Sequence, residues 1–414
     1  MAVPVPEKRI VNFEEMGFGM FIHWGIYSQL AKGEWAQHLL RIPKNDYEKL
    51  KDTFTAENFD AKKIAALAKR AGMKYIVLTA RHHDGFSLYD TRGLSDYDAP
   101  HSAAKRDLIR EYVDACNEFG IFPMFYHTTL DWHVPEFDSD FKKYLQYLRN
   151  SVEILCTEYG KIGGLWFDGN WSKPGADWEE DALYGMIRRH QPDAIIINNT
   201  GLDERGRAGN INLDSVTFEQ GRPEPMNRDG MPKYLAAEMC QTINDHWGCG
   251  KHDFNCKSLP ELIETLCACR KVGANYLLNI GPDGKGGVTK LQEALLEGVG
   301  EWIGVTGDGI YRAKPLGGRG ENRDFILRRD DGRYFAYIHD LKITGGASVT
   351  VNNAGPGRRT FYNVPGRIRS VRWTDNGEEL AFERDGDTLH VTATGYEYGT
   401  SLVVRVAEIV FDRQ

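Results

Sequence analysis

The stretch KIGGLWFDG, residues 161–169, places a carboxylate where an apolar β-strand ends at a glycine. Trp166 and Asp168 are two residues apart, so their side chains share one face of that strand. Barrel enzymes keep their catalytic groups at the carboxyl ends of the strands. For one isolated Asp, a helix cap or a turn is the simpler interpretation. However, FGMFIHWG (18–25) and MKYIVLTARHHDGF (73–86) also end in polar residues, and this repetition favours a functional site.

Eight short apolar segments alternate with amphipathic helices up to about residue 305. The expected strands cover residues 18–24, 73–79, 121–126, 162–168, 194–198, 213–219, 234–240 and 274–280. Asp60 and Asp107 are expected to cap two of the intervening helices, which end at Gly72 and Gly120. The alternation predicts a parallel sheet, and eight repeats predict its closure into a TIM-like (β/α)8 barrel.

The composition changes after residue 311. A Pro- and Gly-rich link, RAKPLGGRGEN (312–322), leads into short alternating strands such as DFILRR (324–329) and TLHVTA (388–393). This pattern predicts a barrel domain over residues 1–311, followed by an all-β sandwich domain over residues 312–414.

Charge and hydropathy exclude several classes of partner. The 414 residues include 51 Lys and Arg against 59 Asp and Glu, and the net charge of −8 comes without a basic block. Nucleic acid is therefore not an expected partner. The start, MAVPVPEKRI, has no signal-peptide pattern, and no stretch approaches the ~20 apolar residues of a membrane span. We expect a cytoplasmic protein without a membrane partner, and a homo-oligomer is compatible with the sequence.

The cysteines predict neither a disulfide framework nor a metal site. Their number, seven, is odd, and Cys267 and Cys269 fall within a helical apolar pattern. The segment CQTINDHWGCGKHDFNC (240–256) holds three Cys and two His but no C-x-x-C pair. Incidental thiols are therefore favoured over structural zinc, and no metal or other cofactor is expected.

Six motifs in the barrel portion are highly specific in combination. They are FGMFIHWGIYS (18–28), GEW (33–35), GMKYIVLTARHHDGF (72–86), LWFDG (165–169), LLNIGPDGKG (277–286) and GEWIGVTGDGIY (300–311). With these motifs the chain resembles the α-L-fucosidases of glycoside hydrolase family 29. The resemblance implies a retaining exo-α-L-fucosidase that uses two carboxylates, needs no cofactor, and acts on a fucosylated oligosaccharide or glycoside.

The resemblance also assigns roles to individual residues. Asp168 of LWFDG matches the family's nucleophile. The residues that match sugar-binding positions are Phe21, His23, Glu34, Trp35, His82, His83, Tyr126 and Trp166. Phe21 is expected to contact the methyl group of the deoxy sugar. Strand alternation independently places Phe21 and His23 on one face.

Retention requires a second carboxyl group, ~5–5.5 Å from the first and protonated at the working pH. Glu219 ends the expected sixth strand, whereas Glu238 lies within the seventh. The segment TFEQ and the proline-containing loop after it resemble the family's acid/base segment, so we choose Glu219 and keep Glu238 as the alternative. Imidazole and indole donors are expected to keep Asp168 ionised, while burial or the Asp168 charge raises the pKa of its partner.

Two segments depart from the family pattern. In INNTG (197–201), Thr200 stands where many relatives place an arginine that reaches the sugar, and Arg205 or Arg207 could replace it. The segment HTTLDWHVPEF (127–137) also differs, and its Asp131, Trp132 and His133 could shape the aglycone side. The preferences for linkage and aglycone therefore stay open.

Two other functions compete with this interpretation. His83 beside Asp84 is compatible with a metal-dependent amidohydrolase barrel, but no His-x-His follows the first strand. A fucose-binding protein that has lost catalysis is the second alternative. The presence of Asp168 together with a usable Glu argues against it.

Overall fold

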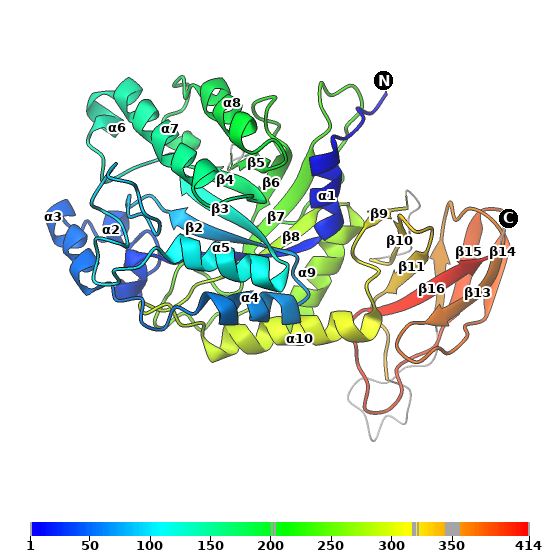
Figure 1. Ribbon diagram of the computed structural model, residues 1–414. Helices are drawn as coiled ribbons and strands as arrows, with labels where there is room; N and C mark the ends of the chain where they lie inside the picture. Colours follow the sequence, from blue (N-terminus) through cyan, green and yellow to red (C-terminus); the bar gives the residue numbers. More distant parts are fainter. Residues whose placement is uncertain are drawn as a thin grey trace. The chain divides into compact units, whose positions relative to one another are not determined.

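The computed structural model describes residues 2–199, 202, 204–316, 320, 323–343 and 357–412 (Figure 1). Eight parallel strands form a closed barrel in chain order. They are β1 (Phe18–Ile22), β2 (Tyr75–Arg81), β3 (Phe122–Thr128), β4 (Gly164–Asp168), β5 (Ile195–Asn198), β6 (Ser215–Glu219), β7 (Ala236–Thr242) and β8 (Asn275–Ile280). Closure occurs where β8 pairs with β1, with Phe18 opposite Tyr276. The predicted TIM-like barrel is therefore confirmed.

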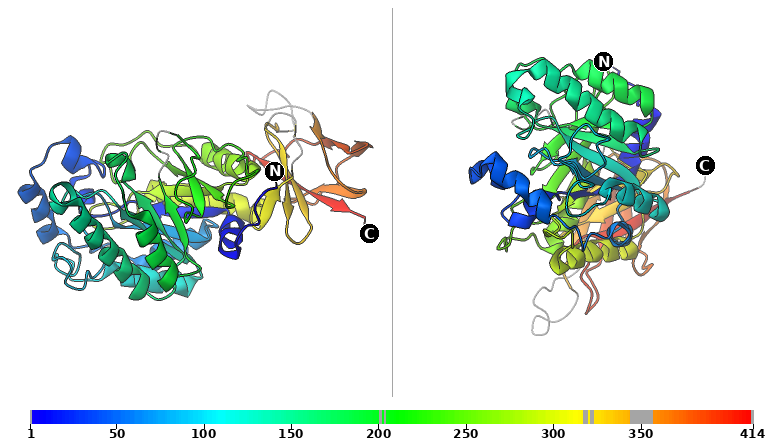
Figure 2. Two further views of the ribbon diagram at one scale, coloured as in Figure 1. Left: turned by 90° about the horizontal axis from the view of Figure 1, so that it is seen from above. Right: turned by 60° about the vertical axis from the view of Figure 1, so that its left-hand side comes forward.

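Helices follow most of these strands, as the alternating pattern predicts. The longer ones are α1 (Lys8–Met16), α4 (Ala61–Arg70), α5 (Leu108–Phe119), α7 (Phe141–Thr157), α8 (Glu180–His190), α9 (Leu259–Lys271) and α10 (Lys290–Thr306). Short turns in the loops are η1 (Ile26–Leu30), α2 (Ala36–Leu39), α3 (Lys44–Tyr47), η2 (Glu48–Thr53), α6 (Glu136–Ser139) and η3 (Asn170–Ser172). Helices α4, α5, α7 and α8 lie outside the strands (Figures 1 and 2).

Local signals in the sequence explain where these helices begin. The Asp60 side chain accepts a hydrogen bond from the Lys63 amide, and Asp107 accepts one from Arg110, so both predicted caps are confirmed. The strand ends differ by up to two residues from the prediction. Strand β2 continues to Arg81, since Arg81 still pairs with His127 of β3.

Alternate residues of the strands fill the inside of the barrel. The buried cluster there includes Tyr75 and Val77 of β2, Met124 and Tyr126 of β3, and Trp166 of β4. These large side chains fill the interior of the barrel, which is therefore a packed core and not a pore. The space that remains lies at the carboxyl end of the strands.

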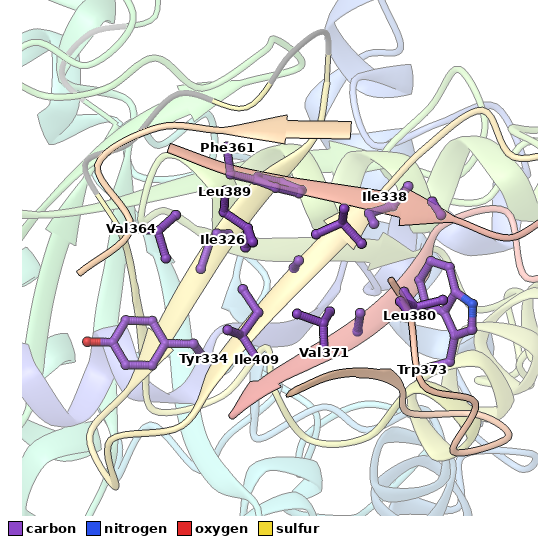
Figure 3. Close-up of a cluster of buried hydrophobic side chains, with 14 of the residues drawn as sticks. Ile326, Tyr334, Ile338, Phe361, Val364, Val371, Trp373, Leu380, Leu389 and Ile409 are labelled. Carbon is purple, nitrogen blue, oxygen red and sulfur yellow. The ribbon is translucent and has the colours of Figure 1, made fainter. Parts of the chain in front are cut away.

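Eight further strands form two antiparallel sheets in the C-terminal region. One sheet has the order β13-β16-β11-β10-β9 and the other β12-β15-β14. The strands are β9 (Ala313–Pro315), β10 (Phe325–Arg329), β11 (Tyr334–Ile338), β12 (Gly357–Phe361), β13 (Ile368–Trp373), β14 (Phe382–Asp385), β15 (Thr388–Ala393) and β16 (Arg405–Phe411). Ile326 and Ile409 of the first sheet join Phe361 and Leu389 of the second in one buried cluster (Figure 3). The predicted β-sandwich is confirmed.

The chain divides into two compact units whose sequences interleave. One unit contains residues 1–257 and 275–297, and the other contains residues 258–274 and 298–414. Helix α9 therefore belongs with the C-terminal sheets, and its Arg270 donates to the carbonyls of Ile310 and Ala313. The domain boundary between residues 311 and 312 stays a prediction.

Two findings concern the membrane span and the disulfides considered in the sequence analysis. No helix in the described part of the chain is long and apolar enough to cross a membrane. All seven cysteines are free thiols.

Candidate active site

A cavity opens at the carboxyl end of the barrel strands. It brings together both residues chosen as catalytic and all eight predicted to bind sugar. The lining consists of Phe21, His23, Glu34, Trp35, His82, His83, Tyr126, Trp166, Asp168, Trp171, Asn199, Leu202, Glu219 and Trp247. The roles of these residues stay predictions.

Asp168 is the last residue of β4, and donors surround its carboxylate. Tyr126 donates its hydroxyl to Oδ2 at 3.0 Å, and the Trp171 indole donates to Oδ1 at 2.9 Å. His83 Nε2 lies 3.5 Å from Oδ2. Burial nevertheless raises the pKa of Asp168, and the hydrogen bonds from Trp171 and Tyr126 oppose this shift. The expected donors are present, but burial has the larger effect on the pKa.

The three histidines of the cavity wall are neutral at ordinary pH. Burial lowers the pKa of His23 and of His83 to about 3, and it lowers that of His82 well below the usual value. His23 Nδ1 lies 2.7 Å from Asn279 Oδ1, and His83 Nδ1 lies 2.7 Å from Thr128 Oγ1, so both rings are held in place.

His82 differs from the other two histidines. Its Nδ1 is buried without a hydrogen-bond partner in the described structure. Buried polar atoms are normally paired, so this nitrogen is an exception among the cavity histidines.

Glu219, the last residue of β6, has a strongly perturbed carboxyl group. Burial and then the charge of Asp168 raise its pKa to about 7, while hydrogen bonds from Asn199 and Trp247 act in the opposite direction. This is the environment that the sequence analysis expects for a general acid.

Asn199 links the two carboxyl groups of the cavity. Its Nδ2 lies 2.6 Å from Glu219 Oε2 and 3.4 Å from Asp168 Oδ1. Because one nitrogen contacts both oxygens, those oxygens lie at most about 6 Å apart, the sum of the two distances. A short separation of this kind fits the ~5–5.5 Å between the carboxyl groups of retaining glycosidases.

Glu238 of β7 does not reach the cavity, because its side chain lies inside the barrel. It is fully buried, and its carboxylate accepts hydrogen bonds from the Trp166 indole, at 2.9 Å, and from the Tyr75 hydroxyl. Burial raises its pKa to about 7 as well. The pKa therefore does not distinguish the two glutamates, whereas access to the cavity favours Glu219.

Sequence reasoning missed four residues of the cavity: Trp171, Asn199, Leu202 and Trp247. Asn199 directly follows β5, so a polar residue at a strand end was a usable signal. Trp171 and Trp247 lie outside the strands, where periodicity carries no information. The Trp247 carbonyl accepts a hydrogen bond from Asn279 at 2.8 Å.

The two arginines considered as replacements for the family's sugar-binding arginine do not line the cavity. Thr200, the position in question, falls outside the described residues. Neither Arg205 nor Arg207 belongs to the cavity wall, and Arg207 is exposed beside Glu204. Within the described residues, no group of three or more His, Cys, Asp and Glu is arranged to hold a metal ion.

The family model for α-L-fucosidases matches residues 6–308. The chain belongs to the α-L-fucosidase family. It is 29% identical to the tissue α-L-fucosidase of Mus musculus in an alignment 393 positions long, which covers 88% of this chain and 85% of that protein. These matches confirm the resemblance seen in the sequence and the class of glycoside hydrolase.

Solved structures of the family show the same architecture. α-L-Fucosidase isoenzyme 1 from Paenibacillus thiaminolyticus superposes with a TM-score of 0.83 at 33% identity, over 98% of this chain and 99% of that one. The α-fucosidase of Thermotoga maritima, solved with a mechanism-based inhibitor, superposes with a TM-score of 0.75 at 27% identity. The match covers 99% of this chain and 97% of that one. The family does not favour the amidohydrolase alternative.

Proposed function

We propose that the protein hydrolyses terminal α-L-fucosyl linkages with retention of configuration, with Asp168 as nucleophile and Glu219 as general acid and base. The observation that carries the proposal is the Asn199 bridge, which limits the separation of the two carboxyl oxygens to about 6 Å. A short separation of the two carboxyl groups suits direct attack by one carboxylate on the anomeric carbon.

The first step forms a covalent intermediate. Asp168 attacks the anomeric carbon while Glu219 transfers its proton to the leaving oxygen, so the glycosidic bond breaks and a fucosyl ester of Asp168 forms. A pKa near 7 keeps much of Glu219 protonated around neutral pH.

The second step releases fucose. Ester formation removes the negative charge of Asp168, which is one cause of the raised pKa of Glu219. The pKa of Glu219 therefore falls in the intermediate, and its carboxylate accepts a proton from the attacking water. Two inversions at the anomeric carbon give net retention.

The rest of the cavity supports binding of a deoxy sugar. The neutral imidazoles offer donors and acceptors to hydroxyl groups, and Phe21 gives an apolar wall for a methyl group. Phe21 packs 5.2 Å from the Trp166 ring and 4.5 Å from the His23 ring, so its position is determined by the barrel core.

The test combines azide rescue with product analysis. Asp168→Ala should be inactive on every α-L-fucoside, and azide should restore turnover as the inverted fucosyl azide. Glu219→Ala should still react with a good leaving group, slow the second step and give the retained azide. NMR of the first product of the wild type should show the α-anomer.

Glu238→Ala is the matched control, because it removes a glutamate whose pKa is also raised to about 7 but which lies outside the cavity. If the activity of Glu238→Ala depends on the leaving group while Glu219→Ala behaves nearly like the wild type, Glu238 is the general acid and base in place of Glu219. A β-anomer as first product would contradict retention. Activity should also survive a chelator, and a loss that zinc restores would favour the amidohydrolase alternative. Binding of fucose without turnover would favour the silent binding protein.

A further inference from the structure

Glu219 lies at the boundary between a rigid strand and a long loop. Strand β6 ends at Glu219, and residues 220–235 lead to β7 as turns and irregular chain. A general acid must lie within hydrogen-bonding distance of the oxygen that it protonates. A displacement of ~1 Å can cost about 10²-fold in rate. The main chain at Glu219 therefore needs to be held in place.

Gln220, the next residue, ends the pairing of β6 with β7. Glu219 pairs with Cys240 of β7, and the Gln220 amide donates to the Cys240 carbonyl at 2.9 Å. Gln220 then adopts a φ of +50°, in the left-handed region that residues other than glycine rarely occupy. The extended chain of β6 therefore ends directly after the residue that carries the carboxyl group.

The Gln220 side chain replaces the strand pairing that stops at this point. Strand β7 continues beyond Cys240 to Thr242. Alternate residues of a strand direct their amides to the same neighbouring strand, so the Thr242 amide points to the side of β6, as Cys240 does. Gln220 Oε1 accepts this amide at 3.4 Å. Gln220 Nε2 donates to Thr242 Oγ1 at 2.8 Å.

These two hydrogen bonds, the Gln220 clamp, join the turn after Glu219 to a buried part of the barrel. Thr242 is 1% exposed, and it pairs in turn with Asn279 of β8. A left-handed conformation of a residue other than glycine persists only where the surrounding structure holds it. The clamp supplies that hold. It fixes the main chain of Glu219, while Asn199 contacts its carboxyl group.

We propose that Gln220 is a positioning residue, whose clamp on Thr242 holds the Glu219 carboxyl group where it can protonate the leaving oxygen. The cavity lining in the described structure does not include Gln220, so it acts through Glu219 and not on the sugar. The inference deepens the proposed function, and it rests on Glu219 as the general acid.

The experiment measures kcat/KM for aryl α-L-fucosides with poor and good leaving groups, phenol and dinitrophenol. Gln220→Leu keeps a side chain of similar size but removes the clamp. It should lower kcat/KM for the phenyl fucoside about tenfold, a part of the ~10²–10⁴-fold that proton transfer contributes. The dinitrophenyl fucoside should react nearly as in the wild type, because its leaving group needs no proton.

Gln220→Gly separates the clamp from the backbone conformation. Glycine adopts a positive φ without strain, but it has no side chain to reach Thr242. Gln220→Gly should therefore show the same leaving-group dependence as Gln220→Leu.

Thr242 provides the partner variants. Thr242→Val removes the hydroxyl but keeps the backbone amide, so its change should go in the same direction and be smaller. Thr242→Ser keeps the hydroxyl and should behave like the wild type. Gln146→Leu is the control, because Gln146 is an exposed glutamine of α7 that donates to Asn150 at 2.7 Å. It should leave the activity on both substrates unchanged.

The results distinguish a failure of this inference from a failure of the proposed function. Equal losses of Gln220→Leu on both substrates, with a lower melting temperature, would show a merely structural role and overturn the inference. Unchanged activity on both substrates would overturn it too. If Glu219→Ala itself shows no leaving-group dependence, Glu219 is not the general acid, and the proposed function fails at that residue.

Discussion

At the scale of single residues, Glu219 determines the expected pH dependence. Its pKa is raised to about 7, and the general acid must be protonated for the first step. On a substrate with a poor leaving group, kcat/KM should therefore fall as the pH rises through about 7. His23 and His83 do not contribute to this fall, since their pKa values are about 3. Glu219→Gln should abolish the alkaline limb in a pH–rate profile. Persistence of that limb in Glu219→Gln and its loss in Glu238→Gln would assign the acid role to Glu238.

Asn199 is a positioning residue that acts on both carboxyl groups. Its amide lowers the pKa of Glu219, and the Thr217 hydroxyl donates to its Oδ1 at 2.8 Å and so orients the amide. Asn199→Ala should lower kcat about 10²-fold, because a donor at a reacting charge is lost. The pKa of Glu219 should rise, which moves the alkaline limb to higher pH. Thr217→Val should also move the alkaline limb to higher pH, but by a smaller amount. An unmoved limb with a lower melting temperature would indicate a merely structural role.

At the scale of elements, helix caps stabilise the barrel without entering the chemistry. The Asp60 side chain accepts the Lys63 amide at 3.0 Å at the start of α4. Asp60→Ala should cost about 1 kcal/mol of stability, visible as a lower thermal midpoint, with kcat/KM unchanged because α4 lies outside the cavity. Asp60→Asn keeps an acceptor and should retain most of the stability. An equal loss in both variants would contradict the cap.

At the scale of the whole molecule, the interleaved units limit how the chain can be shortened. The candidate catalytic residues all lie in one unit, whereas α9 belongs to the other. A cut after residue 311 removes the Ala313 carbonyl that accepts from Arg270 and the Val404 carbonyl that accepts from Trp302. The shortened chain should therefore be poorly soluble, and size-exclusion chromatography should show aggregates. Trp302→Phe in the full chain, the control, should lower only the melting temperature. A soluble, folded but inactive shortened chain would show that the C-terminal region takes part in catalysis.

Much of this architecture follows from local patterns in the sequence. Apolar residues at alternate positions indicate strands, and Asp60 caps the helix that follows it by accepting a hydrogen bond from an amide only three residues away. The convergence of His23, His82 and Asp168 could also be predicted, because the carboxyl ends of parallel strands in a barrel meet at one mouth.

The choice between Glu219 and Glu238 needed the tertiary structure. Both glutamates lie on neighbouring apolar strands, and burial raises both pKa values to about 7. Only the closed barrel separates them: Glu219 ends β6 at the mouth, whereas Glu238 points inward and is covered by Tyr75 and Trp166. The Asn199 bridge likewise joins residues from different strands. Such contacts depend on how the strands are arranged around the barrel, and no local pattern carries that information.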